Sequence, residues 1–172
     1  MNCLIKAMET EDEIRGKAYV HWKSWQETYA GIVDAGYLSR MTLDKCESRA
    51  TLYQDNTWVA KVGERVVGFT AAGKYRGEDG RETDTGEVYA IYVLQEYQHQ
   101  KIGYALMRFS LSQLSDCRTV CVWVLAENRN AVSFYEKLGF RADGAEKELM
   151  LGTPVKAIRM TIFNSEGGCT PC

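Results

Sequence analysis

The sequence lacks an uninterrupted apolar run of about 18 residues, the length that a membrane-spanning helix needs. The first residues, MNCLIKAMETEDEI, become acidic where a secretory signal would be apolar. There is also no excess of basic residues, because 21 lysines and arginines face 23 aspartates and glutamates, which gives a net charge of −2. Binding to the phosphate backbone of nucleic acid relies on such an excess. We therefore expect a cytoplasmic protein whose partners are neither membranes nor nucleic acids.

The chain also lacks the grouped cysteines and histidines that build a metal centre or a disulfide scaffold. The pair Cys169 and Cys172 forms a C-x-x-C motif, but no second pair or histidine cluster completes the four ligands of a zinc site. The other cysteines lie in apolar patterns, where cysteine acts as a small core residue: Cys3, Cys46, Cys117 and Cys121. We expect no metal cofactor, and a redox or adventitious metal role for the tail is the minor alternative.

What the chain does contain is a series of helical and β-rich segments that fits one domain, which we place at residues 1–163, followed by a flexible tail at 164–172. Thr10 and Glu13 have the spacing of a capping box and predict a helix that continues to about Tyr29. Two shorter helical segments follow. The remaining predicted helices cover about 101–115 and 128–139, and the predicted strands are CLIKAM, TWVAKV, ERVVGFTAAGKY, TGEVYAIYVL, TVCVWVL, FRADGAEKEL and VKAIRMTIF.

This order of segments predicts an α+β domain with a mixed, mostly antiparallel sheet. The strand TGEVYAIYVL, the helix after it and the strand TVCVWVL form a β-α-β crossover, so these two strands should make the one parallel pair. Because TVCVWVL is almost continuously apolar, we expect it to be covered on both faces.

The stretch EYQHQKIGYAL begins the crossover helix with amides, a histidine and a lysine, and with no carboxylate after Glu96. A helix that starts directly after a strand directs several backbone N–H groups to one spot, where the helix dipole adds positive charge. Gly103 would allow a ligand to approach the backbone. These features favour a seat for a phosphate or pyrophosphate, although many strand–helix junctions are polar only because they meet water.

YVLQEYQHQKIGYAL and VWVLAENRNAVSFYEKLGF, in this order, closely resemble the GNAT superfamily of acetyl-CoA-dependent N-acetyltransferases. The family's pyrophosphate loop, Q/R-x-x-G-x-G/A, is matched by Gln98 and Gly103, but Lys101 stands where the first glycine is usual. Lysine is harmless there if its backbone is right-handed, because its amide still donates, and it is a problem if the site demands a positive φ. Asn128, Phe134 and Tyr135 match the second motif. The resemblance covers nearly the whole chain.

The resemblance implies a GNAT fold, with about six to seven strands in a twisted sheet flanked by about four helices. It also implies acetyl-CoA as cosubstrate, held along a bulged strand that parts from its parallel neighbour. A backbone N–H near the bulge would stabilise the oxyanion. The cofactor-binding residues that it implies are Ile91, Tyr92 and Val93 along the strand, Gln98, His99, Gln100, Lys101, Ile102, Gly103 and Tyr104 in the loop, and Asn128, Ser133 and Tyr135.

The implied reaction is direct attack of an amine on acetyl-CoA in a ternary complex. Tyr135 corresponds to the family's general acid, since a phenol can protonate the leaving thiolate. By its helical spacing it could equally be a core residue. The amine must lose a proton before attack, and Glu87 is the leading base because strand alternation would place it with Tyr89 on the face of Ile91 and Val93. An acid at the start of a strand is also often simply solvated.

The acceptor is the least determined part of the prediction. Trp25, Tyr29 and Tyr89 are weak candidates for its walls, and we expect His21 to serve packing or the substrate wall. The acceptor could be the primary amine of a small molecule or of a peptide N-terminus, and the protein could be a monomer or a homodimer. The main alternative is a non-catalytic domain that binds or senses acyl-CoA. Acetylation of charged tRNA is disfavoured because no basic excess is present.

Overall fold

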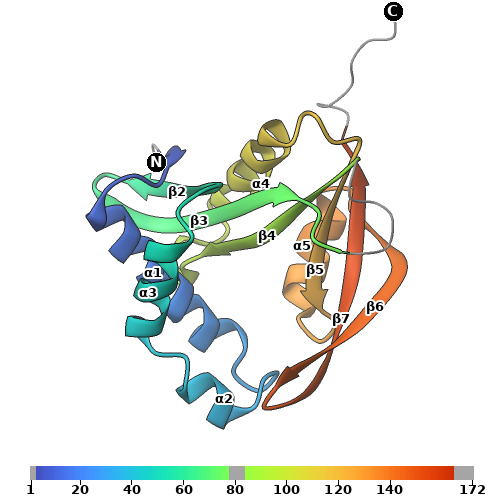
Figure 1. Cartoon of the computed structure of the whole chain (residues 1–172), viewed down its shortest axis with the longest axis horizontal. Coiled ribbons are helices and arrows are strands. Elements are labelled where there is room, and N and C mark those ends of the chain that lie inside the picture. The colour runs from blue at the N-terminus through green and yellow to red at the C-terminus, as the bar shows by residue number, and fades with distance from the viewer. Residues whose placement is uncertain (1–2, 78–83, 165–172) are drawn as a thin grey trace, which may run out of the picture.

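The computed structural model describes residues 3–77 and 84–164, which form a sheet with helices on both faces (Figure 1). Cys169 and Cys172 lie outside the described residues, as does the predicted tail apart from Asn164. The elements in chain order are β1 (Leu4–Ala7), α1 (Glu11–Thr28), α2 (Ala35–Ser39), α3 (Leu43–Leu52), β2 (Thr57–Val62), β3 (Arg65–Lys74), β4 (Thr85–Val93), the short 3₁₀ helix η1 (Gln95–Tyr97), α4 (Ile102–Gln113), β5 (Thr119–Leu125), α5 (Arg129–Lys137), β6 (Arg141–Leu151) and β7 (Thr153–Phe163).

The seven strands form one sheet in the order β1-β2-β3-β4-β5-β7-β6. All neighbouring strands are antiparallel except β4 and β5, which are parallel and joined by α4. The α+β class, the mostly antiparallel sheet and its one parallel pair at the crossover are therefore as predicted. The described residues form five α-helices rather than about four.

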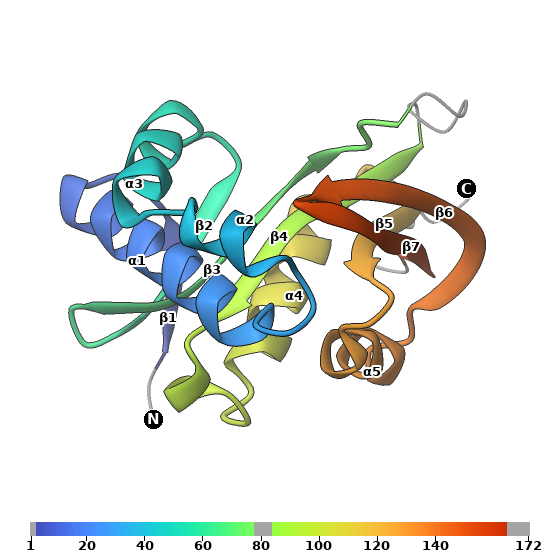
Figure 2. The same ribbon diagram turned by 90° about the horizontal axis from the view of Figure 1, so that it is seen from below.

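The helices cover the two faces of the sheet unequally (Figures 1 and 2). On one face α4 and α5 pack over β4, β5 and β7, in a core that includes Met107, Val122 and Phe140. On the other face α1 packs over β2 and β3 through Val20 and Phe69, and α3 lies against α1. Only Thr119 and Trp123 of β5 are not fully buried, which is the near-continuous burial expected of a strand covered on both faces. The C-terminal end of α1 and the short helix α2 extend past the part of the sheet that α1 covers, toward β7 (Figure 1).

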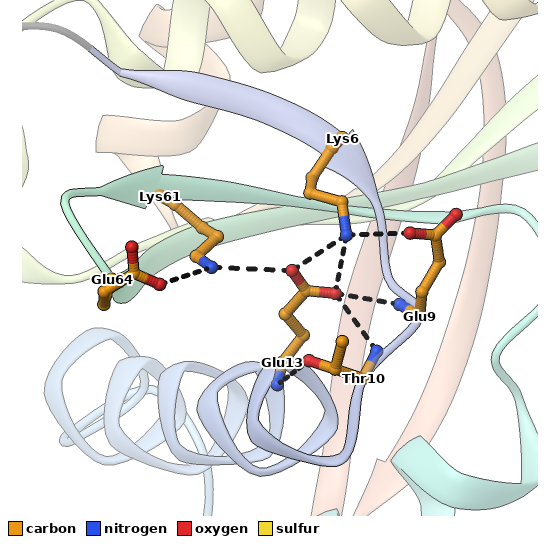
Figure 3. A network of polar contacts seen from close by, with 6 residues as sticks. All are labelled: Lys6, Glu9, Thr10, Glu13, Lys61 and Glu64. Atoms are coloured by element: carbon orange, nitrogen blue, oxygen red, sulfur yellow. Dashed lines mark hydrogen bonds and ion pairs between the residues drawn. The ribbon is translucent and has the colours of Figure 1, made fainter.

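The first helix begins with the predicted capping box. The Thr10 hydroxyl accepts from the Glu13 amide at 3.2 Å, and the Glu13 carboxylate accepts from the amides of Thr10 and Glu9 (Figure 3). The same carboxylate is bonded by the ammonium of Lys6 at 2.9 Å, and Lys61 lies 3.6 Å away. Glu13 is only 3% exposed, so this network ties α1 to β1 and β2 inside the fold.

The last described residue, Asn164, forms hydrogen bonds at the C-terminal end of α4. Its side-chain amide donates to the carbonyls of Leu111 and Leu114, and its backbone amide donates to Arg118. These carbonyls belong to the last turn of α4, where helical partners are missing. Asn164 is 3% exposed and therefore belongs to the folded domain.

Candidate active site

The strands β4 and β5 are paired over only three residues, ending with Glu87 opposite Cys121. Beyond that point β4 continues to Val93 and β5 to Leu125, and the two strands diverge (Figure 1). Their outer sides remain paired with β3 and β7, so backbone donors and acceptors of both strands face each other across the gap. This is the parting of parallel neighbours that the sequence predicts, and it can accept an extended ligand by strand addition.

A β-bulge lies in β4 at the point where the gap begins. Ala71 of β3 pairs with Ala90, and Ala72 pairs with Val88, so Tyr89 is the extra residue. A bulge bends its strand and interrupts the alternation of side chains. The bulge confirms the predicted irregularity in this strand, but it also changes which side chains share a face.

The prediction that Glu87 shares a face with Ile91 and Val93 is wrong. Glu87 and Tyr92 pair with Gly73 and Phe69, which lie four residues apart on β3 and therefore on one face. Glu87 is thus on the face of Tyr92, the side covered by α1, because the bulge shifts the alternation by one residue. Ile91 and Val93 point the other way and pack toward α4.

The loop before α4 presents a row of free amides. Among the described residues, the backbone N–H groups of residues 99–104 have no hydrogen-bond acceptor. Six consecutive donors at a helix start form a suitable seat for a pyrophosphate. An added Cβ at Gly103 would make ordinary van der Waals contact with the Phe134 ring, at 3.4 Å, so the packing of the protein does not itself require a glycine here. That Gly103 lets a ligand approach the backbone remains a prediction. The amides of His99, Gln100, Lys101, Ile102, Gly103 and Tyr104 are thus available to an anion, and their binding of the coenzyme A diphosphate remains a prediction.

The side chains of this loop contribute less than the sequence suggests. Gln98 donates to the Val93 carbonyl at 3.2 Å, and Gln100 donates to the Glu96 carbonyl at 3.1 Å, so both brace the loop. Ile102 is 4% exposed and packs inward, which leaves only its amide for a ligand. Tyr104, by contrast, is exposed on the first turn of α4.

Lys101 adopts the conformation that its residue type disfavours. Its φ is +64° and its ψ is 6°, so the backbone is left-handed, and His99 has a φ of +60°. The first glycine of the family's loop thus corresponds to a position that needs a positive φ, and a right-handed backbone at Lys101 is excluded. A left-handed backbone destabilises an L-residue by about 1 kcal/mol or more. The loop adopts it at Lys101 although this residue has a Cβ atom.

Polar groups of Trp25, Tyr29 and Tyr92 meet on the α1 side of the gap. The Trp25 indole N–H donates to the Tyr92 hydroxyl at 3.0 Å, and the hydroxyls of Tyr29 and Tyr92 are 3.3 Å apart. Burial raises the pKa of both phenols, while a hydrogen bond with Asn128 lowers that of Tyr29. The family resemblance implies a role only for the backbone of Tyr92. Its hydroxyl carries no signal in the sequence, because strand tyrosines are usually packing residues.

Tyr135 lies on α5, in the core cluster that also contains Ile91 and Val122. Burial raises the pKa of its phenol well above the ordinary value, and the nearby phenol of Tyr29 raises it further. Tyr135 is 8% exposed, so it is a core residue, and its phenol interacts electrostatically with that of Tyr29. Its role as the general acid remains a prediction. Asn128 caps α5 by accepting from the Ala131 amide at 3.2 Å.

Ser133 lies away from this group. It lines a shallow hollow of about 460 Å³ together with Glu136, Lys137 and Arg141. Since Ser133 belongs to the outer side of α5, the structure does not bring it together with Tyr135 and Tyr92. A contact with the cosubstrate remains a prediction for this residue.

Glu87 is buried and bound to an arginine. Its carboxylate accepts from the Arg76 guanidinium at 3.1 Å and from the Arg76 amide at 3.1 Å. The Arg76 side chain is 63% exposed and stacks 3.7 Å from the centroid of the Tyr89 ring. Tyr89 in turn donates to the Lys74 carbonyl at 2.6 Å. Glu87 can act as a base toward the α1 side only if Arg76 releases one carboxylate oxygen.

His21 packs among the rings of Trp25, Phe69 and Tyr92. Burial, assisted by the charges of Lys17 and Arg49, lowers its pKa to about 3. The imidazole is therefore neutral near pH 7, and its place in the core agrees with the predicted packing role.

Comparison with known proteins identifies the fold that carries this site. The family model described as "Acetyltransferase (GNAT) domain" matches residues 53–142. This range contains the diverging strands, the amide-rich loop and Tyr135. The chain belongs to the GNAT acetyltransferase family. It is thus an N-acetyltransferase with acetyl-CoA as cosubstrate, and the expectation drawn from its two motifs is confirmed.

Two curated relatives carry acetyltransferase names. The uncharacterized N-acetyltransferase YuaI of Bacillus subtilis is 31% identical over 169 residues, which cover 89% of this chain and 94% of the relative. The [ribosomal protein bS18]-alanine N-acetyltransferase of Escherichia coli K12 is 27% identical over 60% of this chain and 81% of its own length. Neither name gives support to the alternative of a non-catalytic sensor.

A solved structure shows the same fold with coenzyme A bound. The PaiA N-acetyltransferase from Thermoplasma acidophilum in complex with coenzyme A superposes with a TM-score of 0.71 at 21% identity, covering 95% of this chain and 99% of that protein. In the described part of this chain, no group of three or more His, Cys, Asp and Glu side chains could hold a metal ion, and no helix is long and apolar enough to cross a membrane.

Proposed function

We propose that this acetyltransferase acetylates the primary amine of a small molecule or a peptide N-terminus, by direct attack in a ternary complex. The observation that carries the proposal is the parting of β4 from β5 beyond Glu87, with the amide-rich loop at one end of the gap and the hydroxyls of Tyr29, Tyr92 and Tyr135 around it. The bS18-alanine relative acts on a protein alanine by its name, which supports an amine on a peptide.

In the proposed reaction the amine nitrogen forms a bond to the acetyl carbon, and the bond from that carbon to sulfur breaks. The amine's surplus proton passes to Glu87, directly or through water, after Arg76 shifts from the carboxylate. Tyr135 gives a proton to the departing thiolate and regains one from the nitrogen as the amide forms, a role for which a phenol that burial keeps protonated is suited. Both groups are positioned by rigid elements, Glu87 by the paired end of β4 and Tyr135 by α5, which supports orientation of the reactants.

The test is release of thiol from acetyl-CoA with a panel of acceptors that includes spermidine, an aminoglycoside and short peptides. We expect Tyr135→Phe to lower kcat about 10²-fold, as for loss of a general acid, with little change in acetyl-CoA binding measured by calorimetry. Tyr53→Phe, a matched change at a tyrosine that is 70% exposed at the end of α3, should leave kcat unchanged. Equal activity of Tyr135→Phe and parent would remove Tyr135 from the reaction, and tight acetyl-CoA binding with no acceptor turned over would favour a sensor.

A further inference from the structure

A pocket of about 190 Å³ lies where α1, α2 and α3 meet. Figure 2 shows these three helices side by side, away from α4 and α5. The inner wall of the pocket is formed by Trp25, Tyr37 and Cys46, and its rim carries three cations, Arg40, Lys45 and Arg49. No carboxylate lines it, although Asp44 and Glu47 belong to the same helix as Lys45. The pocket therefore combines an aromatic wall with positive charge.

These three cations have no acidic partner. Among the described residues, no carboxylate lies within 4.0 Å of Arg40, Lys45 or Arg49. Arg40 stacks on the Tyr37 ring at 5.8 Å, and Lys45 donates to the Arg40 carbonyl at 2.8 Å. By contrast, exposed cations on the neighbouring α1 are paired, as Arg15 is with Asp12 at 2.8 Å and Lys23 is with Glu27 at 3.3 Å. The cations of the pocket therefore differ in their pairing from those of the adjacent α1.

A buried cation, Lys17, lies on α1 close to Cys46 of the pocket. Lys17 is 7% exposed, and its ammonium lies 4.8 Å from the centroid of the Phe69 ring with no ion pair in the described chain. Burial raises the pKa of the Cys46 thiol, while the charges of Lys17 and Arg49 lower it. An anion entering the pocket would meet favourable charge from its rim and from behind its wall.

The pocket shares a wall with the candidate active site. One side of the Trp25 indole lines the pocket, and its N–H donates to the Tyr92 hydroxyl in the gap between β4 and β5. The Trp25 side chain therefore contacts both the pocket and the Tyr92 hydroxyl on the α1 side of that gap. The rings of Tyr29 and Tyr37 flank that indole at 4.8 and 6.4 Å and continue the wall toward the site.

We propose that this basic pocket binds an anionic group of the acceptor, so that the preferred substrate is an amine whose molecule also carries a carboxylate or phosphate away from the reacting nitrogen. The proposal rests on the proposed function and specifies its substrate class. Arg40 and Arg49 determine specificity, with Trp25 as the spacer between the anion and the amine. Polycationic acceptors such as polyamines are disfavoured, because their second amine would be repelled by the same cations.

The test compares short peptides that share an N-terminal alanine and differ at one later position, which holds glutamate, phosphoserine, glutamine or lysine. We expect kcat/KM for the glutamate or phosphoserine peptide to exceed that for the glutamine peptide about tenfold, and the better of the two identifies the anion. The double variant Arg40→Gln/Arg49→Gln should abolish this preference through a rise in KM for the glutamate and phosphoserine peptides. The control Arg15→Gln/Lys23→Gln removes the same charge from α1 and should keep the preference.

Binding of N-acetylated peptides, which have no reactive amine, separates this inference from the proposed function. Calorimetry should show that the acidic acetylated peptide binds the parent about tenfold more tightly than its glutamine counterpart, and that only the Arg40/Arg49 variant loses the difference. An equal affinity of both peptides for the parent, or a preference that survives in that variant, overturns the inference. If the acidic preference in binding is present but no peptide is acetylated, the pocket assignment stands and the proposed peptide acceptor fails.

Discussion

The network around Glu13 provides a quantitative prediction about how this fold is held together (Figure 3). Burial would raise the pKa of Glu13, but hydrogen bonds from the amides of Glu9 and Thr10, and from the Lys6 ammonium, outweigh it and lower the pKa from 4.5 to about 2. At about 1.4 kcal/mol per pH unit, this gap corresponds to at most about 3.5 kcal/mol of stability. Because Lys6 is 29% exposed and its charge is screened, we expect about 2 kcal/mol.

The pH dependence follows from the sign of this difference. A carboxyl whose pKa is lower in the folded state stabilises the fold fully above its unfolded pKa of 4.5, and this contribution decreases as pH falls toward 2. Replacing Glu13 by glutamine should therefore lower the free energy of unfolding by about 2 kcal/mol at pH 7, and by about 0.8 kcal/mol at pH 3. Glutamine keeps the size of the side chain and an acceptor for the capping box, so packing is little affected.

Urea unfolding of both proteins between pH 7 and pH 3, followed by circular dichroism, measures this difference. Glu64→Gln is the control, because Glu64 is fully exposed and pairs with Lys61, a member of the same network, so its loss should cost less than about 0.5 kcal/mol. A difference between parent and Glu13→Gln that stays constant from pH 7 to pH 3 would show that shape, and not charge, explains the effect of Glu13, and would refute the reasoning.

Two further predictions concern the candidate site. Because Lys101 has a positive φ, we expect the variant Lys101→Gly to unfold at the same temperature as the parent or up to about 4 °C above it. The variant Lys101→Val should unfold below the parent. Calorimetric midpoints in the reverse order would contradict a left-handed residue at this position. We expect Glu87→Gln to lower kcat/KM about 10²-fold and Arg76→Gln to change it only a few-fold. Equal losses in both variants would mean that the pair only holds the chain at Arg76 in place.

The fold could be predicted from sequence because its signals are local. The Thr10–Glu13 capping box, the apolar run of β5 and the polar start of α4 each depend on a few neighbouring residues, and the parallel pair follows from strand order. The positions of single side chains were less predictable. Strict alternation placed Glu87 on the wrong face, because the bulge at Tyr89 adds one residue to β4 and is invisible in the sequence of that strand alone.

Features of the site that depend on distant segments also escaped prediction. Arg76, which binds Glu87, belongs to a polar stretch after β3 that contains no motif, and the contact exists only because β3 and β4 are paired. The hydroxyl of Tyr92 meets Trp25, 67 residues earlier in the chain, and no spacing rule connects the two. The backbone of Lys101 became clear only from its dihedral angles, since its sequence context allowed either conformation.

The short pairing of β4 with β5 also bears on self-association. Free strand edges at a sheet's periphery can recruit a second chain and lead to aggregation. In this protein the unpaired edges of β4 and β5 face each other inside the sheet. The gap between them narrows to hydrogen-bonding distance at Glu87 and Cys121. The narrow end of this gap offers less room to a β-strand with side chains than to the unbranched arm of an acyl thioester. The open backbone groups of β4 and β5 therefore lie in the interior of the sheet and not at its outer edges, which are β1 and β6.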